Sequence, residues 1–198
     1  MEFFNRWAPW FMWKLQGDFK ISLLSAAAII GNSGQESGGF KSLQEKKPVV
    51  PGSRGGYGIM QWTGSRRKLY EAYCKRNGLD PANMEVNYKF LFVELHGDEG
   101  KDGKVLERVE AAKTLDKKTE VFMEEFLRPG IPHLDQRKIW AARALKAWEA
   151  SEYAKKSTPE PVEEPKPTPA PVEPTKPKRS LWAILWEILY AFISSRYR

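Results

Sequence analysis

A proline-rich segment near the C-terminal end of the chain limits where a folded core can form. Residues 157–179 read "STPEPVEEPKPTPAPVEPTKPKR" and contain 8 of the 14 prolines in the sequence. Proline lacks a backbone N–H and fixes its φ angle, so this segment is expected to form a semi-rigid spacer that reaches up to about 70 Å. The sequence therefore predicts three parts: a globular domain over 1–156, this linker over 157–179, and a C-terminal segment over 180–198.

Composition narrows the class of protein. The chain has 198 residues, of which 41% are hydrophobic, and a net charge of +7. Such a charge favours polyanions, which include nucleic acid, anionic lipid and the bacterial cell wall. The basic residues are scattered and form no stripe with interleaved aromatics, so nucleic acid is not a predicted partner. The single Cys74 excludes an internal disulfide, fits a reducing compartment and is typical of a small buried apolar residue.

The first part of the chain is expected to be mainly α-helical, with one core. Its apolar residues recur at helical spacing, and no alternating strand pattern or internal repeat is present. Residues 41–58 are rich in Gly, Pro and Lys and predict a loop or short hairpin. The predicted helix boundaries include an N-cap at Asp18, an N-cap at Thr63 or Ser65, and Pro81 in a first turn. The expected helices lie within residues 3–13, 19–36, 63–78, 80–97, 119–130 and 133–156.

One acidic residue stands among glycines at the end of an apolar run. The sequence "GNSGQESGGF" over residues 31–40 follows "ISLLSAAAII" and contains Glu36. Gly38 and Gly39 are expected to stop the helix just beyond it. A helical stripe that would point inward comprises Ile21, Leu24, Ala28, Asn32 and Glu36. A carboxylate at a helix end is often a cap or a solvated charge, so this position alone leaves both interpretations open.

The chemistry of glycosidic bond cleavage suits a glutamate in that place. The reaction needs a proton donor at the leaving oxygen, and a solvated glutamate is ionised near neutral pH. Burial against an apolar wall disfavours the charged form of a carboxyl group and raises its pKa. Glu36 is therefore a candidate general acid.

A second motif follows about twenty residues later. The sequence "RGGYGIMQWTGSRR" over residues 54–67 combines a glycine-rich turn with aromatic and hydrogen-bonding side chains. We interpret it as one wall of a glycan cleft, in which aromatic faces stack on sugar rings and polar groups bind hydroxyl and N-acetyl groups. Arg66 and Arg67 could meet peptide carboxylates or be solvated. The candidate substrate-binding residues are Tyr57, Gly58, Gln61, Trp62 and Thr63.

These motifs resemble those of the bacteriophage tail-lysozyme family, a branch of the lysozyme-like superfamily. The resemblance rests on "GNSGQESGGF", "GYGIMQWTGSRR", "NYKFLFVEL" and "FLRPGIPHLDQRKIWAARAL", in that order, and covers about residues 7–150. More distantly, the motifs are similar to those of goose-type lysozymes and lytic transglycosylases. The family's acid falls on Glu36, and its cleft turn falls on Gly58, Gln61, Trp62 and Thr63. Two positions depart from the pattern: Asn87 stands where Gln is expected, and Leu127 where the family often has an acid.

The resemblance implies a lysozyme-like helical domain that cleaves the β-1,4 bonds between N-acetylmuramic acid and N-acetylglucosamine in peptidoglycan. We therefore expect a phage-type endolysin, with Glu36 as general acid and no cofactor. The second carboxylate is open: Glu45 is a candidate, and its surroundings "QEKK" equally suit a solvated face. A lytic transglycosylase, a virion-associated tail lysozyme, and a non-enzymatic glycan-binding or membrane-disrupting protein are the alternatives. His96 and His133 lack zinc-binding spacing, so no metal site is predicted.

The C-terminal segment "SLWAILWEILYAFISSRYR" is expected to be an amphipathic helix that lies in a membrane surface. Its apolar stretch of about 15 residues is short of the roughly 20 needed to span a bilayer. Docking on a partner protein or self-association is the alternative. The candidate membrane residues are Leu181, Trp182, Leu185, Trp186, Ile188, Leu189 and Phe192.

The N-terminal residues do not resemble a secretory signal. Arg6 and Pro9 interrupt the apolar stretch that a signal peptide would need. We therefore expect synthesis in the cytoplasm of a bacterial host and action in the periplasm or cell wall at a membrane surface. A separate pore protein or the C-terminal segment itself would provide the route across the inner membrane.

Overall fold

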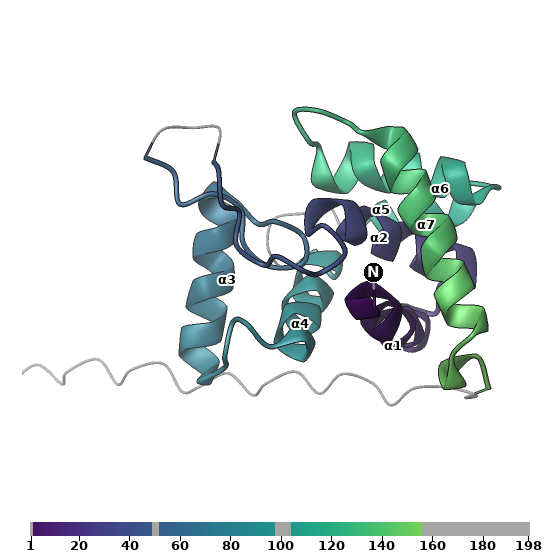
Figure 1. The fold of residues 1–198 in the computed structure, drawn as a ribbon, viewed down its shortest axis with the longest axis horizontal. Coiled ribbons are helices and arrows are strands. Elements are labelled where there is room, and N and C mark those ends of the chain that lie inside the picture. The colour runs from purple at the N-terminus through teal and green to yellow at the C-terminus, as the bar shows by residue number, and fades with distance from the viewer. Residues whose placement is uncertain (1, 49–51, 98–103, 156–198) are drawn as a thin grey trace, which may run out of the picture. The chain divides into compact units, whose positions relative to one another are not determined.

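The computed structural model describes residues 2–48, 52–97 and 104–155 (Figure 1). The predicted linker over 157–179 and the predicted membrane helix over 180–198 lie outside these residues. The elements are α1 (Glu2–Phe19), α2 (Leu23–Glu36), α3 (Gly64–Asn77), α4 (Met84–Leu95), α5 (Val105–Ala111), α6 (Leu115–Phe122), a π-helical turn η1 (Met123–Leu127), α7 (Leu134–Glu149) and a 3₁₀ turn η2 (Glu152–Lys155).

The prediction of a mainly α-helical domain with a small loop region is confirmed within the described residues. Within the described residues, strand-like pairing is limited to isolated antiparallel bridges between Gln44 and Tyr57 and between Tyr57 and Trp62. These bridges lie in the segment between α2 and α3, where a loop or short hairpin is expected. None of the described helices combines the length and apolar character that crossing a membrane requires.

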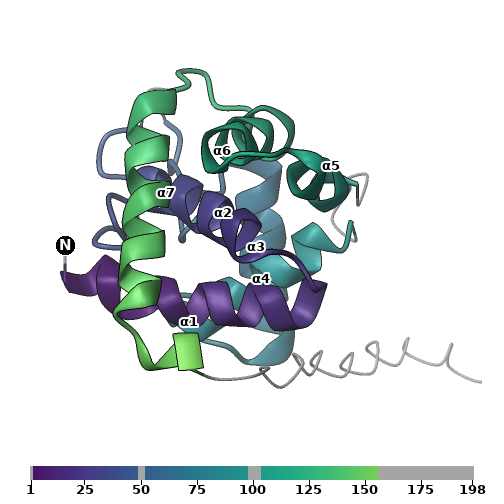
Figure 2. The ribbon, with the colours of Figure 1, turned by 90° about the vertical axis from the view of Figure 1, so that its right-hand side faces the viewer.

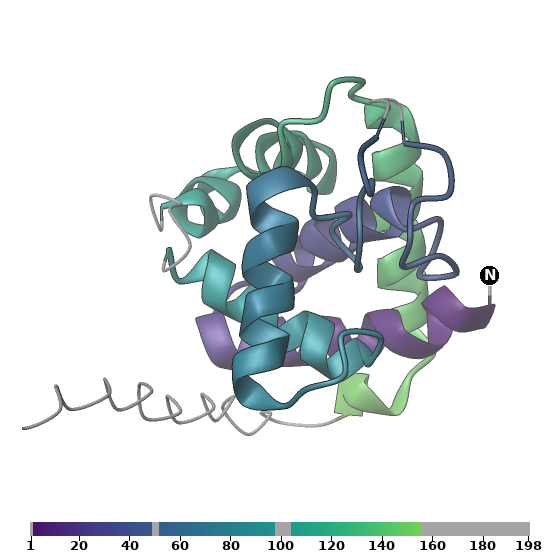
Figure 3. The same ribbon diagram turned by 90° about the vertical axis from the view of Figure 1, so that its left-hand side faces the viewer.

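Helix α2 is the centre of the core. Its residues are buried from Ser25 to Gly34, and α1, α6 and α7 pack around it (Figure 2). Helix α3 lies beside the loop that follows α2, with α4 next to it (Figure 3), and α4 packs on α1 through the contact of Tyr88 with Trp10. The contact between α2 and α7 is close because Gly31 has no side chain: a Cβ atom there would lie 2.4 Å from the backbone nitrogen of Ala141. This arrangement holds the last turn of α2 against the first turns of α7.

The start of α2 differs from the prediction. Asp18 is not its N-cap, because α1 continues to Phe19 and the Asp18 carboxylate accepts a hydrogen bond of 2.6 Å from the Tyr88 hydroxyl. Ser22 caps α2 instead, since its side chain accepts a hydrogen bond from the backbone N–H of Ser25. The predicted inward stripe is wrong at Leu24, which is 36% exposed.

The N-terminal end of α2 is tied to α5 and α6 by a polar network. The Glu110 carboxylate on α5 accepts hydrogen bonds from both the backbone N–H and the hydroxyl of Ser22. Lys118 on α6 is buried, and its ammonium group donates to Ser25 Oγ at 2.9 Å and to the Val109 carbonyl at 3.0 Å. A positive charge near the last carbonyls of α5 and a negative charge at the start of α2 both complement the helix dipoles.

The end of α2 agrees with the prediction. The helix ends at Glu36, and the next residues turn the chain through left-handed conformations, with φ of 58° at Gly38 and 74° at Gly39. Gly39 is also needed for packing, because a Cβ atom there would lie 2.6 Å from the Trp140 ring. Glu36 is thereby placed at a corner where α2 stops and the loop begins.

Two other boundaries depart from the sequence prediction. Pro81 precedes α4 rather than lying in its first turn: Asn83 is the N-cap, and its side chain accepts from the backbone N–H groups of Glu85 and Val86. The Pro81 carbonyl instead accepts a hydrogen bond of 2.7 Å from the Tyr70 hydroxyl. Helix α5 was not predicted, because its seven residues are too few to show a clear apolar period.

Candidate active site

A pocket of about 410 Å³ opens between the end of α2, the loop that follows it, the start of α3 and the segment after η1. Both candidate catalytic carboxylates, Glu36 and Glu45, are among its lining residues. The full lining comprises Glu36, Glu45, Met60, Gln61, Thr63, Arg66, Leu127, Arg128, Pro129 and Gly130.

Glu36 reaches the pocket from the last residue of α2. Its side chain is 19% exposed, and its Oε1 lies 2.8 Å from Nη2 of Arg137. Arg137 comes from the first turn of α7 and is 3% exposed; it also donates to Asn32 Oδ1 at 3.2 Å and to the Pro132 carbonyl at 2.7 Å. Glu36 was expected against an apolar wall, but in the structure it is paired with a buried arginine, which fixes the direction of its carboxylate.

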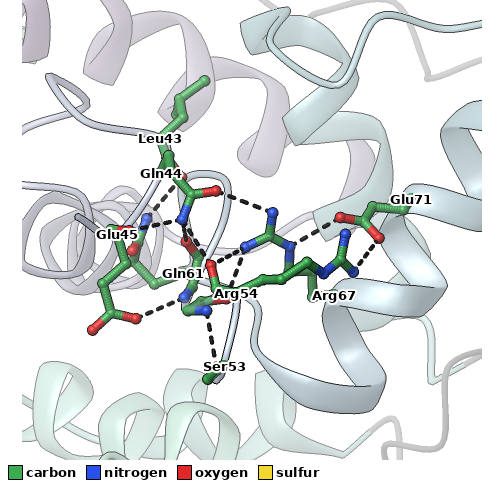
Figure 4. A network of polar contacts seen from close by, with 10 residues as sticks. Leu43, Gln44, Glu45, Ser53, Arg54, Gln61, Arg67 and Glu71 are labelled. Carbon is green, nitrogen blue, oxygen red and sulfur yellow. Dashed lines mark hydrogen bonds and ion pairs between the residues drawn. The ribbon is translucent and has the colours of Figure 1, made fainter. Parts of the chain in front are cut away.

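Glu45 reaches the pocket from the loop after α2. Its backbone N–H donates to the Gly56 carbonyl at 2.9 Å, and its Oε2 accepts from the Gly56 N–H at 2.7 Å. Figure 4 shows the other carboxylate oxygen without a bond to any of the residues drawn. Gly55 permits this approach, because a Cβ atom there would lie 2.8 Å from Glu45 Oε2. Glu45 is therefore held in place through one oxygen, and the other accepts no hydrogen bond from the described residues.

Arg67 holds the loop that carries Glu45. Its guanidinium donates to the carbonyls of Arg54 at 2.6 Å and Gly55 at 2.9 Å, and to Gln44 Oε1 at 3.0 Å (Figure 4). Glu71 on α3 in turn binds Arg54 at 2.6 Å and Arg67 at 2.9 Å. The hydrogen bond from Arg54 is the main reason that the pKa of Glu71 lies below its usual value. Arg67 is thus used within the fold rather than presented to a ligand.

The turn before α3 places two predicted binding residues in the pocket. Gln61 has a φ of 45°, and its amide nitrogen donates to the carbonyls of Gly58 at 2.9 Å and Leu43 at 3.1 Å. Gln61 therefore stabilises the turn as well as lining the pocket. Thr63 is exposed at the N-cap of α3, where its side chain makes no capping hydrogen bond. Among the described residues its hydroxyl has no hydrogen-bond partner, so it can bind a ligand.

The predicted sugar contact of Trp62 is wrong. Its side chain is 0% exposed, and its indole N–H donates to Glu94 Oε2 at 2.6 Å. Gly58 is also buried; its N–H donates to the Leu43 carbonyl, and a Cβ atom there would lie 2.3 Å from the Trp62 ring. Gly58 and Trp62 therefore pack against each other inside the domain. Tyr57 is half-buried and lies outside the pocket lining, so its sugar contact stays a prediction.

The sequence model of the phage tail lysozyme family matches residues 8–148 of the chain. The chain belongs to this family. No curated protein shows significant similarity to it. Membership of the phage tail lysozyme family indicates a lysozyme-like enzyme that degrades peptidoglycan, and peptidoglycan is accordingly its substrate.

Asn87, which stands where the family pattern has Gln, takes part in a local network of hydrogen bonds. Asn87 is buried, and its Oδ1 accepts from the Ile59 backbone N–H at 3.0 Å. Its amide nitrogen donates to the carbonyls of Pro81 at 3.0 Å and Asn83 at 2.8 Å. The residue therefore ties the turn beside the pocket to α4, and its polar groups are satisfied.

The far wall of the pocket in this tail-lysozyme domain was not predicted from the sequence. It consists of Leu127, the last residue of the π-helical turn η1, and of residues 128–130, which follow that turn. Arg137, the partner of Glu36, was also missed, because the two residues are separated by most of the domain and no local pattern links them. Within the described residues, no group of three or more His, Cys, Asp or Glu side chains gathers in a way that could hold a metal ion.

Proposed function

We propose that the protein is a phage-type endolysin that hydrolyses the β-1,4 bonds between N-acetylmuramic acid and N-acetylglucosamine, with Glu36 as the general acid. The observation that carries this proposal is that Glu36 and Glu45 line one pocket from two different segments. Glycosidases commonly use two carboxyl groups on either side of the scissile bond. Membership of the phage tail lysozyme family supports the same substrate class.

In this mechanism Glu36 donates a proton to the glycosidic oxygen as the bond to the anomeric carbon breaks. A sugar bound over the pocket excludes water from the bond that breaks. Arg137 acts as a positioning residue: its bond of 2.8 Å to one carboxylate oxygen leaves the other oxygen to face the substrate.

Glu45 is the candidate second carboxylate. Its bond to the Gly56 N–H leaves one oxygen that can accept a proton from an attacking water or attack the anomeric carbon itself. The separation of the two carboxyl groups in the enzyme–substrate complex decides between these routes, with about 5–5.5 Å for direct attack and about 6.5–9.5 Å for a water. Gln61 and Thr63 are placed to bind hydroxyl or N-acetyl groups of the sugar.

A lytic transglycosylase is the alternative reaction class. Such an enzyme needs no second carboxylate and leaves 1,6-anhydro ends, so the place of Glu45 in the pocket favours hydrolysis. Mass spectrometry of the product ends separates the two, because hydrolysis adds one water molecule per cleaved bond. A role in the virion tail during cell entry is the alternative biological setting, and proteomics of purified particles would detect it.

The second part of the proposal is that residues 180–198 bind the enzyme to a membrane. We place this segment in the plane of a bacterial membrane, with Trp182, Trp186 and neighbouring aliphatic residues in the interface. The linker over 157–179 then lets the catalytic domain reach the wall from the membrane surface. In this setting the enzyme is made in the host cytoplasm and acts in the periplasm.

The first test is the rate at which purified peptidoglycan loses turbidity with the wild type and with Glu36→Gln. Removal of a general acid is expected to lower the rate about 10²-fold or more. Glu149→Gln is the matched control, since Glu149 is an exposed glutamate that also ends a helix. Equal rates for the wild type and Glu36→Gln, with both variants folded, would show that Glu36 is not the acid.

A further inference from the structure

Two arginines line the pocket, and their surroundings differ. Arg66 donates from Nε and Nη2 to the Glu94 carboxylate at 2.7 Å in both cases. Glu94 is 1% exposed and also accepts from Trp62, so this pair belongs to the buried interior of the domain. The charge of Arg66 is therefore balanced inside the protein.

Arg128 is exposed, and its charge is not balanced by a carboxylate among the described residues. Its Nε donates to the backbone carbonyl of Glu125 at 3.1 Å, and its backbone N–H donates to the Met123 carbonyl at 2.8 Å. The backbone bond holds the main chain and the other bond holds Nε, so the two terminal nitrogens of the guanidinium have no hydrogen-bond partner among the described residues. These nitrogens form the part of arginine that binds a carboxylate in a two-pronged manner.

The segment that carries Arg128 is held in one shape. Arg128 and His133 adopt left-handed conformations with φ of 51° and 46°, and prolines at 129 and 132 restrict the backbone between them. The Pro132 carbonyl accepts a hydrogen bond from Arg137, the residue that binds Glu36. Arg137 thus connects the wall that carries Arg128 to the proposed acid, Glu36. Because the backbone of this wall is already restricted, binding of a ligand costs less conformational entropy there.

We propose that Arg128 binds a carboxylate of the muramic acid side of the substrate, so that the enzyme selects acidic glycans over neutral ones. This inference rests on the proposed function, since it takes the pocket as the place where the glycan binds. Peptidoglycan offers two sources of this chemistry: the lactyl carboxylate of a muramic acid without a peptide, and the carboxylates of an attached stem peptide. A neutral glycan such as chitin offers neither.

The experiment measures binding in the Glu36→Gln background, so that the ligand is not consumed. Co-sedimentation compares Arg128→Gln and Arg128→Lys with the parent protein, which carries Glu36→Gln alone. The affinity of each is measured for intact peptidoglycan and for peptidoglycan whose carboxylates have been converted to amides. Arg128→Gln is expected to weaken binding to the intact material about tenfold or more, because a charge-assisted hydrogen bond is lost. On the amidated material the three proteins are expected to bind alike. Arg128→Lys keeps the charge but loses the two-pronged geometry, so it should recover only part of the affinity for the intact material.

Lys75→Gln is the control for net charge, because Lys75 is exposed in the last turn of α3 and lies outside the pocket lining. Lys75→Gln in the same background should bind as tightly as the parent protein that carries Glu36→Gln alone. In glycan strands freed of peptide, every muramic acid presents its lactyl carboxylate. An effect of Arg128→Gln on these strands shows that Arg128 binds the lactyl carboxylate, and a lost effect assigns the peptide carboxylates. Melting temperatures verify that every variant is folded.

Two results would overturn the inference: an equal loss for Arg128→Gln on intact and amidated material, or no loss on either. Failure of the proposed function is seen separately, as an absence of cleavage by the protein with Glu36 and Arg128 intact. If that protein binds through Arg128 and does not cleave, carboxylate recognition stands and the enzymatic proposal falls.

Discussion

At the scale of single residues, Arg137 connects α2, α7 and the wall after η1 through one guanidinium. It binds Glu36, Asn32 and the Pro132 carbonyl while remaining 3% exposed. Arg137→Met leaves these acceptors without their donor, and we expect the free energy of unfolding to fall by about 2–4 kcal/mol, since breaking a buried pair is costly. Arg137→Lys keeps the charge but cannot make all three bonds, so its kcat should fall about tenfold with little change in KM. Urea unfolding and steady-state rates would check both, and an unchanged kcat for Arg137→Lys would contradict a positioning role.

The second residue-scale prediction concerns pH and the loop that carries Glu45. The bond from Arg54, with that from Arg67, lowers the pKa of Glu71 in the folded protein. A lowered pKa in the folded state adds stability above the pKa of the unfolded chain, and this stability is lost as pH falls through the folded pKa. The wild type should therefore be more stable than Glu71→Gln at pH 7, and the difference should shrink below about pH 4.5. Urea unfolding at several pH values measures it, and a difference independent of pH would count against the ion pair.

At the scale of elements, the close contact of α2 with α7 depends on Gly31. Alanine is favoured over glycine inside a helix by about 1 kcal/mol. The Cβ atom of Gly31→Ala would nevertheless lie 2.4 Å from the backbone of Ala141, which cannot move like a flexible side chain. We expect a net loss of about 1–3 kcal/mol in the free energy of unfolding, together with reduced activity as Glu36 and Arg137 are displaced. Gly130→Ala is the stability control, since a Cβ atom there meets nothing within 4 Å. Equal stability of the two variants would refute the close-contact argument.

The helices also show what a sequence can and cannot predict. The cap at Thr63, the Asn-Gly pair at the end of α3 and the glycines after Glu36 are local signals, and the helix and the stop that they predict are present. Trp62 failed as a sugar platform because the same aromatic side chain fits a cleft or a core, and only its distant partner Glu94 decides between them. The pairing of Glu36 with Arg137 is likewise a tertiary contact with no local signature. The sequence therefore predicted that Glu36 and Glu45 belong to the site, but it did not predict the side chains that contact them, such as Arg137.

At the scale of the whole molecule, the pocket and the proposed membrane segment are separate in the sequence. The pocket lining ends at Gly130, and the helices that support it end by residue 155. A chain truncated after residue 156 is therefore expected to cleave purified peptidoglycan at a rate within about twofold of the full chain. It should fail to co-sediment with vesicles that contain anionic lipid, whereas the full chain should bind them.

The basic residues that bracket the C-terminal segment add a salt dependence to this last prediction. Lys176, Lys178 and Arg179 precede the apolar stretch, and Arg196 and Arg198 follow it. Attraction between these charges and anionic lipid weakens as salt is raised, while burial of apolar side chains does not. Vesicle binding of the full chain should thus decrease from low to physiological salt without vanishing, and replacing Leu185 and Leu189 with glutamate should abolish it at both. Binding that survives truncation or these substitutions would place the membrane contact in the catalytic domain, and binding absent from the full chain would leave partner docking or self-association as the role of this segment.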